Sequence, residues 1–349
     1  MSSIRYRLGL LVMACVALGA CSRPPERASQ KFTGRLIFLS GANASSRDLV
    51  ELTPSPDGST YNLKTIESGL AEAAASPDQN KILCATKDDI QLRELSTGAA
   101  KSIIKGESFC PQWAPDGNHF SYQQRAAGTT KFYVSDLDGQ TKLILEDPNG
   151  STDCPHWIAR DRLVIDRFVG ARTNKGAEQL KPNTSIVVTL GEPVKLKDTP
   201  KKWSIESLCL KSNNGFVRSD QGRLLIAKNI DNFESIDPSP ASCTECRFVG
   251  YASQSCTPFF VEQPSNTTTE LFYLNPMDWQ KQKPASIGWT FSPNARFVIK
   301  SSARLAIVGD APDKLLLIDA ESGDVTPFFP NKASPPIIVS PAPIVWIEK

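Results

Sequence analysis

Residues 113–122 read Trp-Ala-Pro-Asp-Gly-Asn-His-Phe-Ser-Tyr, a tight-turn sequence between two apolar stretches. Pro115 suits the first corner of a tight turn, and Asp116-Gly117 suits the positions that follow it. The apolar residues on both sides of the turn predict two strands joined as a hairpin. A second hairpin is predicted over residues 131–145, where an Asp138-Gly139 turn separates two more apolar runs. The unit therefore consists of four short antiparallel strands.

The same pattern recurs along the chain. Ala75-Ser76-Pro77-Asp78 leads into residues 81–84, and Phe291-Ser292-Pro293-Asn294 leads into residues 296–299. Weaker copies occur at Trp157 and at Val339-Ser340-Pro341. Because an aromatic residue that recurs at the repeat period is typical of packing between units, we expect a structural role for these positions. The repeat residues are Pro77, Asp78, Trp113, Pro115, Asp116, Gly117, Trp157, Phe291 and Pro293.

Units of four strands, repeated about every 40–45 residues, are typical of a β-propeller. We expect an all-β propeller over residues 34–349, with seven blades, or six if the middle of the chain holds one irregular unit. Candidate starts for two middle blades lie near residues 207–210 and 255–258. Residues 34–67 lack a first strand, which the C-terminal strand can supply, and this pairing would close the ring. No helix longer than about two turns is expected.

The aromatic residue, the Ser-Pro-Asp-Gly-type turn and the strand that follows resemble the WD40-like repeat (PD40 repeat) of the TolB family. The resemblance covers residues 34–349 and is clearest in the units that begin near Ala75, Trp113 and Phe291. Proteins of that family carry an α/β domain before the propeller, whereas here the propeller pattern follows a short polar segment. The resemblance implies a TolB-like propeller in the bacterial envelope. It does not imply the role of TolB itself.

The N-terminus has the pattern of an export signal. Arg5 and Arg7 precede an apolar or small run over residues 8–20. Leu18-Gly19-Ala20-Cys21 resembles the lipobox of bacterial lipoproteins, which implies a signal peptide over residues 1–20 and a lipid on Cys21. An uncleaved anchor is the alternative, but the run is shorter than the roughly 20 residues that span a bilayer. Residues 21–33 would then be a lipidated tether.

Charge and hydropathy limit the location and the partners. The chain has 39 basic and 37 acidic side chains, and removal of Arg5 and Arg7 would leave 37 of each. This balance argues against a nucleic-acid-binding protein, which usually shows a basic surplus. No second apolar run is long enough to span a membrane, so the lipid is the expected anchor. Ser22 occupies the position at which an aspartate would mark inner-membrane retention, so we expect the outer membrane, facing the periplasm.

The chain contains nine cysteines, of which Cys15 lies in the predicted signal peptide and Cys21 is the predicted lipid attachment site. Disulfides are expected in an oxidising compartment. Cys84 lies in an apolar strand and is expected to be a buried free thiol. Cys110 and Cys154 occupy the same place in neighbouring units, and Cys209 and Cys256 look similarly related; these pairings require Cα atoms closer than about 7 Å. Cys243 and Cys246 are expected to form a local disulfide, with zinc or redox chemistry as alternatives.

No catalytic constellation is evident in the sequence. His119 is expected at the surface and His156 in a first strand that lines the central channel, and neither predicts a metal or a cofactor. Propellers present faces of loops, and the stretches 170–183 and 264–269 are expected to form loops longer than simple turns. We therefore predict a non-enzymatic scaffold that binds an envelope protein. The alternative is a propeller enzyme, a lyase or glycan-acting hydrolase, with its site at the channel mouth.

Overall fold

The computed structural model describes most of the chain between residues 32 and 347. The residues that lie outside the description within this range are 44, 58–59, 149–151, 153, 169–181, 199–202, 210–213, 220–223, 228–235, 239–246, 252–256, 266–267, 276–281, 283–284, 288–290, 292–294, 300–304, 311–313, 320–321 and 330–341. Contacts divide the chain into two units, Met1–Phe32 and Thr33–Lys349. All the strands belong to the second unit.

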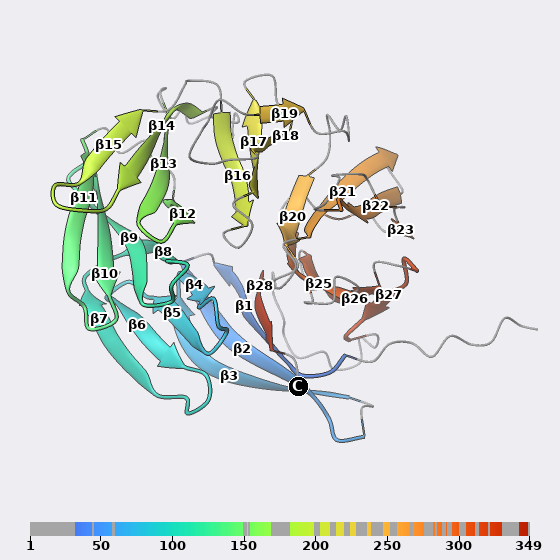
Figure 1. The fold of residues 1–349 in the computed structure, drawn as a ribbon. Helices are drawn as coiled ribbons and strands as arrows, with labels where there is room; N and C mark the ends of the chain where they lie inside the picture. Colours follow the sequence, from blue (N-terminus) through green and yellow to red (C-terminus); the bar gives the residue numbers. More distant parts are fainter. Residues whose placement is uncertain are drawn as a thin grey trace, which may run out of the picture. The chain divides into compact units, whose positions relative to one another are not determined.

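The described strands form seven four-stranded antiparallel sheets (Figure 1). The first contains β28 (Ala342–Ile347), β1 (Arg35–Asn43), β2 (Ser46–Pro54) and β3 (Tyr61–Leu70). The second contains β4 (Glu72–Ala75), β5 (Lys81–Ala85), β6 (Asp89–Glu94) and β7 (Ala100–Lys105). The third contains β8 (Phe109–Trp113), β9 (His119–Ala126), β10 (Thr129–Asp136) and β11 (Thr141–Asp147). The fourth contains β12 (His156–Ala159), β13 (Arg162–Phe168), β14 (Pro182–Thr189) and β15 (Lys195–Asp198).

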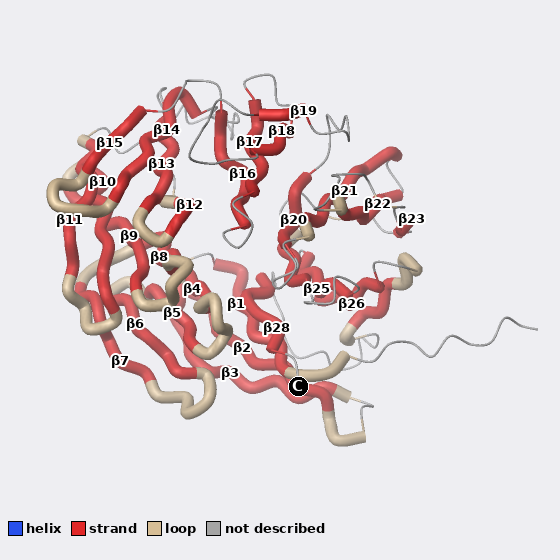
Figure 2. The backbone as a smooth tube through the Cα atoms, viewed as in Figure 1, coloured by secondary structure: helices blue, strands red, loops and turns tan. Residues whose placement is uncertain are grey.

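The other three sheets have the same order of strands. The fifth contains β16 (Trp203–Cys209), β17 (Asn214–Ser219), β18 (Leu224–Ala227) and β19 (Ile236–Pro238). The sixth contains β20 (Arg247–Tyr251), β21 (Pro258–Ser265), β22 (Thr268–Tyr273) and β23 (Ala285–Ile287). The seventh contains β24 (Arg296–Ile299), β25 (Leu305–Asp310), β26 (Lys314–Asp319) and β27 (Val325–Pro327). Strand is the only regular structure in the described part of the chain, as Figure 2 shows.

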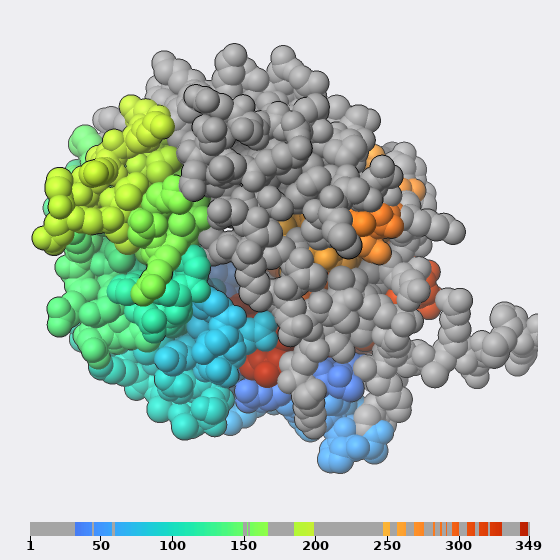
Figure 3. Space-filling model, viewed as in Figure 1, coloured from blue at the N-terminus to red at the C-terminus, as the bar shows by residue number. Residues whose placement is uncertain are grey.

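The hydrophobic core lies between consecutive sheets. One cluster joins Leu83 and Ile90 of the second sheet to Trp113 and Phe120 of the third. The next joins the third sheet to the fourth. Middle strands such as β5 are apolar and buried on both faces, because each sheet is covered by a neighbour on either side. The outer strand β15, by contrast, is exposed along its whole length, and it lies at the surface in Figure 3.

The two ends of the second unit meet in one sheet. β28 pairs antiparallel with β1, with Leu36 opposite Trp346 and Ile37 opposite Val345. In Figure 3 the red atoms of the C-terminal segment lie among the blue atoms of the N-terminal strands. The first strands of consecutive sheets also contact one another, including β24 with β28 and β28 with β4. Hydrogen-bonded ladders occur only within each sheet, so strand pairing leaves separate sheets and does not show a closed ring.

Two of the predicted repeat copies have a different register in the structure. The strand after Pro293, β24, is the first strand of its sheet, whereas the repeat predicts a second strand there. The reason is that the apolar run of β25 takes the second position, and β23 completes the preceding sheet. Likewise β28 follows Pro341 instead of preceding it. The residue that occupies the position equivalent to Trp113 is therefore Trp346, near the end of β28, and not a residue before Pro341.

The prediction that residues 264–269 form a long loop is also wrong. β21 continues to Ser265 and β22 begins at Thr268, and these two residues pair with each other. Only residues 266–267 connect the strands, because the threonines that follow suit a strand. Most of the other predicted loop, residues 170–183, lies outside the described residues.

Within the described part of the chain, no helix has the length and apolar character needed to cross a membrane.

Candidate functional site

The repeat turns are held by their own side chains. The hydroxyl of Ser76 donates to the carboxylate of Asp78 over 2.5 Å and accepts the main-chain N–H of Lys81 over 2.9 Å. Asp116 accepts the main-chain N–H of Asn118 over 2.9 Å, and His119 Nδ1 lies 2.9 Å from its Oδ2. Pro77 and Gly117 lie in these same turns. Asp78 and Asp116 therefore hold the hairpins together, which is a structural role.

The repeated tryptophans connect neighbouring strands. The indole nitrogen of Trp113 donates to the main-chain oxygen of Ala74 in the preceding sheet over 2.9 Å. Trp346 of β28 donates in the same way to the main-chain oxygen of Thr33 over 2.8 Å. Phe291 packs in the core between the sixth and seventh sheets. Trp113 and Phe291 thus fill the space between neighbouring sheets. Pro293 lies outside the described residues.

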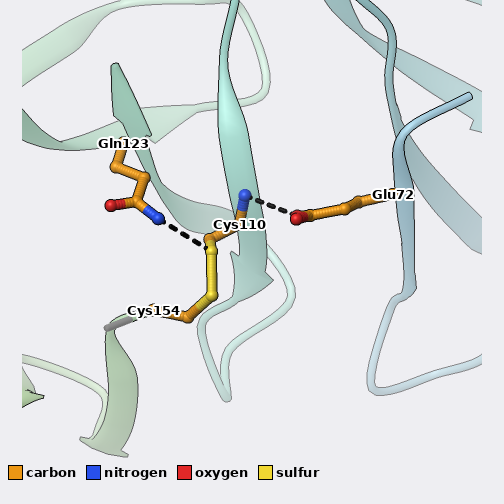
Figure 4. The surroundings of a disulfide bond; sticks show 4 residues. All are labelled: Glu72, Cys110, Gln123 and Cys154. Atoms are coloured by element: carbon orange, nitrogen blue, oxygen red, sulfur yellow. Dashed lines mark hydrogen bonds between the residues drawn. A yellow bond between two sulfur atoms is a disulfide. The ribbon is translucent and has the colours of Figure 1, made fainter. Parts of the chain in front are cut away.

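A disulfide joins the third sheet to the segment before β12. It links Cys110 to Cys154, whose Cα atoms are 5.4 Å apart, and this is the pairing that the repeat predicts (Figure 4). Cys110 lies at an irregularity in β8, and its φ is +52°, a strained value for a residue other than glycine. The side-chain amide of Gln123 donates to the Cys110 sulfur over 2.9 Å. The bond thus covalently connects two neighbouring sheets.

Of the other cysteines, Cys84 is a buried free thiol in β5. Burial raises the pKa of its thiol to about 12, because the thiolate would lose its hydration. Cys21, Cys243, Cys246 and Cys256 lie outside the described residues. The backbone of Cys209 ends β16.

Glu72 connects the second sheet to this strained position. Its carboxylate accepts the main-chain N–H of Cys110 over 2.5 Å, and Figure 4 shows the side chain directed at that nitrogen. Burial raises the pKa of Glu72, while the hydrogen bond from Cys110 and the charges of Arg47 and Arg125 oppose the rise. The carboxylate of Glu72, the first residue of β4, is thus partly buried and experiences the positive charges of Arg47 and Arg125.

A pocket of about 390 Å³ lies between the first strands β20, β24 and β28. This volume falls within the range of small-molecule binding sites. Two arginines line it together with apolar side chains; the lining includes Arg247, Arg296, Phe248, Val249, Phe297 and Pro343. The guanidinium of Arg247 lies over the ring of Phe297, 5.7 Å from its centroid, in a cation–π contact. The pocket therefore combines positive charge with apolar walls.

Arg47, near the start of β2, belongs to the same electrostatic group. Burial lowers the pKa of Arg47, the carboxylate of Glu72 opposes this, and the charge of Arg296 lowers it further. Burial likewise lowers the pKa of Arg247, with Asp310 opposing and Arg296 adding to the effect. Arg296 therefore lies close enough to repel both other arginines. We call Arg47, Arg247 and Arg296 with the pocket the basic site.

The two histidines lie elsewhere. His119 begins β9 and its side chain is 45% exposed, as expected for a surface residue. His156 begins the first strand β12. Among the described residues, no three His, Cys, Asp or Glu side chains are grouped so that they could hold a metal ion. The chemistry that the described side chains of the basic site offer is recognition of an anion by guanidinium groups.

No protein-family model and no curated protein matches the chain. Solved structures do match. An oligogalacturonate lyase from Vibrio parahaemolyticus is 12% identical, with 85% of this chain and 86% of that one covered and a TM-score of 0.56. The β-propeller domain of the Trilobed protease from Pyrococcus furiosus is 13% identical, with 86% and 100% covered and a TM-score of 0.53. The fold is a β-propeller.

TolB from Acinetobacter baumannii also matches the propeller, at 15% identity over 90% of this chain and 67% of that one, with a TM-score of 0.40. A score this low carries no argument about function. At 12–13% identity, the likeness of the other two propellers shows the fold alone. The structures similar to this propeller include enzymes, so the fold by itself does not decide between binding and catalysis.

The residues of the basic site were not among the candidates that the sequence suggested. Arg47, Arg247 and Arg296 lie on strands of three different sheets. Arg47 and Arg247 belong to no motif, and Arg296 follows the repeat copy at residues 291–294 in a position to which the repeat assigns no role. Their only common signal is a charged residue at or near the start of a strand, which is too frequent to single them out.

Proposed function

We propose that the protein is a lipid-anchored, non-enzymatic binding propeller of the bacterial cell envelope. Its seven sheets would be seven blades of a closed ring, with β28 completing the N-terminal blade. Two observations support this closure: β28 pairs with β1, and the first strands of consecutive sheets contact one another. Because β28 covers the edge of β1, the two ends of the propeller are held in one sheet, which suits a rigid scaffold.

An envelope location is supported by the N-terminus and by the disulfide. The lipobox at Leu18–Cys21 predicts a lipid on Cys21, and the tether over residues 21–33 would hold the propeller near the membrane. The Cys110–Cys154 disulfide is compatible with the oxidising periplasm, because such bonds rarely persist in a reducing cytosol. The outer membrane, facing the periplasm, is the proposed location.

The basic site is the observation that carries the binding function. Arginine and aromatic side chains are the residues most enriched where proteins recognise partners. In the basic site, arginines and aromatic side chains of β20 and β24 line one pocket with apolar walls, and the charge of Arg296 acts on Arg47 of β2. We propose that another envelope protein docks there. The competing candidate is an enzyme acting on an acidic glycan, which the same positive charge would suit, as the oligogalacturonate lyase among the similar structures illustrates.

Cross-linking in intact cells, followed by purification of the lipoprotein, tests the proposal. A single envelope protein should be captured by the native chain and lost when Arg247 and Arg296 are both replaced by Gln. Replacement of the exposed Lys195 and Lys197 on β15 by Gln is the matched control and should not reduce capture. Turnover of an oligogalacturonate or a peptide by the purified protein, abolished by His156→Ala, would establish the enzyme instead.

The anchor is tested separately by Cys21→Ala. This variant should leave the precursor uncleaved or release the protein from the membrane fraction. Normal membrane fractionation of a processed Cys21→Ala protein would show that Cys21 is not the lipid attachment site.

A further inference from the structure

We propose that the pocket between β20, β24 and β28 binds the free C-terminal carboxylate of a peptide chain whose last side chain is apolar. This inference rests on the proposed function, because it names the part of the partner protein that the basic site recognises. It depends on three features of the pocket: its surplus charge, the position of Arg296 and the chemistry of its walls.

The first feature is the charge. Two arginines, Arg247 and Arg296, line the pocket, and the carboxylate of Asp310 acts on Arg247. Two positive charges against one negative charge leave a surplus of one. A single negative charge satisfies this surplus, so a carboxylate fits better than a doubly charged phosphate.

The second feature is Arg296. Its side chain is exposed, and no carboxylate forms an ion pair with it in the described part of the chain. Its charge repels both Arg47 and Arg247. An anion bound in the pocket beside Arg247 and Arg296 would relieve the repulsion between these two guanidinium groups. Because the guanidinium is planar and has several donors, it can hold a carboxylate by two parallel hydrogen bonds.

The third feature is the apolar wall. Phe248, Val249, Phe297 and Pro343 line the same pocket as the two arginines, and each is partly exposed. An acidic side chain in the middle of a peptide would bring charge without an apolar group beside it. A C-terminal residue brings both, since its carboxylate and its side chain leave the same Cα atom. Burial of that side chain against the wall would add a favourable hydrophobic contribution.

The test uses the full lipoprotein purified in detergent and three peptides measured by isothermal titration calorimetry. The peptides are N-acetyl-Ala-Ala-Phe with a free carboxylate, the same peptide as the C-terminal amide, and N-acetyl-Ala-Ala-Glu-amide. The free carboxylate should bind about tenfold or more tightly than either amide, and its affinity should fall as salt is added. Equal binding of the Phe acid and its amide, or no binding of the acid, would overturn the proposal.

Variants assign the effect to the pocket. Arg296→Gln should weaken binding of the free carboxylate about tenfold or more. Arg296→Lys keeps the charge but loses the planar guanidinium, so its affinity should lie between those of the native protein and of Arg296→Gln. Lys197→Gln on the outer strand β15 is the control and should bind as the native protein does. Thermal unfolding of each variant shows that it is folded. Unchanged binding by a folded Arg296→Gln protein contradicts the proposal.

The outcomes separate this inference from the proposed function. Capture of an envelope protein that depends on Arg247 and Arg296, without preference for the free carboxylate, would leave the binding function intact and refute the C-terminal ligand. Carboxylate-specific peptide binding, together with the absence of any captured protein in cells, would support the pocket chemistry and refute the scaffold.

Discussion

The indole nitrogen of Trp157 lies 3.1 Å from both the main-chain oxygen of Gln112 and the hydroxyl of Ser121, so one N–H connects β12 to β8 and β9. The side chain is 5% exposed and packs in the core between the third and fourth sheets. A residue that recurs in the sequence thus provides both packing and a polar link between neighbouring sheets.

Replacement of this indole should destabilise the propeller. Trp157→Phe keeps an aromatic ring but loses the donor and leaves a cavity, so we expect the free energy of unfolding to fall by about 2 kcal/mol or more. Urea denaturation measures the loss. The control is Leu196→Ala on β15, where the side chain is 51% exposed and the change should stay within about 0.5 kcal/mol. Equal stability of the two variants would contradict a linking role for Trp157.

The disulfide between Cys110 and Cys154 should contribute to stability. It closes a loop with a sequence separation of 44 residues, and replacement of both cysteines by Ala should cost about 2–4 kcal/mol in the free energy of unfolding. Peptide mapping without reductant should recover residues 110 and 154 in one linked product. Recovery of the two peptides separately, with alkylated thiols, would show that the bond does not form.

Substitution of two glycines, Gly139 and Gly128, can distinguish the energetic cost of backbone strain from the cost of a close atomic contact. A Cβ atom at Gly139, where φ is +87°, would lie 2.5 Å from the main-chain oxygen of Ile103 in the neighbouring sheet. Gly128 has a similar φ of +83° and open space around it. Gly128→Ala should therefore cost about 1 kcal/mol for the left-handed backbone alone, and Gly139→Ala about 1–3 kcal/mol more. Chemical denaturation of both variants measures the difference in the free energy of unfolding. Equal losses of stability would mean that the backbone at Ile103 shifts to accommodate the added methyl group at little cost.

The Asp116 turn should make stability depend on pH in the acid range. Burial would raise the pKa of Asp116, but the hydrogen bonds from Asn118 and His119 outweigh it, so the pKa lies below its ordinary value. A carboxyl whose pKa is lowered by folding stabilises the protein above its unfolded pKa of about 3.9, and this stabilisation is lost as pH falls through the folded pKa.

Asp116→Asn should accordingly be less stable than the native protein at pH 6, and the difference should shrink as the pH is lowered below about 4. Thermal unfolding at a series of pH values measures it. Leu196→Ala on β15 is a useful comparison, because an exposed apolar side chain does not titrate. A difference for Asp116→Asn that is constant across the series would contradict the lowered pKa.

Local sequence determined the turns, the strand type and much of the packing between sheets. Pro115-Asp116-Gly117 forms a hairpin because proline presets one backbone angle, Gly117 accepts a φ of +67° and the Asp116 carboxylate caps the turn. The period of 44 residues between Cys110 and Cys154 predicted their pairing, since equivalent positions in stacked sheets lie close together. These features depend on neighbours along the chain or on the repeat period, both of which are visible in the sequence.

Tertiary structure decided the register of the weaker units and the composition of the basic site. The sequence between residues 285 and 327 contains more apolar runs than one four-stranded sheet can hold. Packing against the neighbouring sheets places β23 in the sixth sheet and β24 in the seventh. Arg47, Arg247 and Arg296 are separated by up to 249 residues in sequence, yet their charges act on one another. Like charges converge here because the sheets place the starts of their strands together, a consequence of backbone topology that no local pattern encodes.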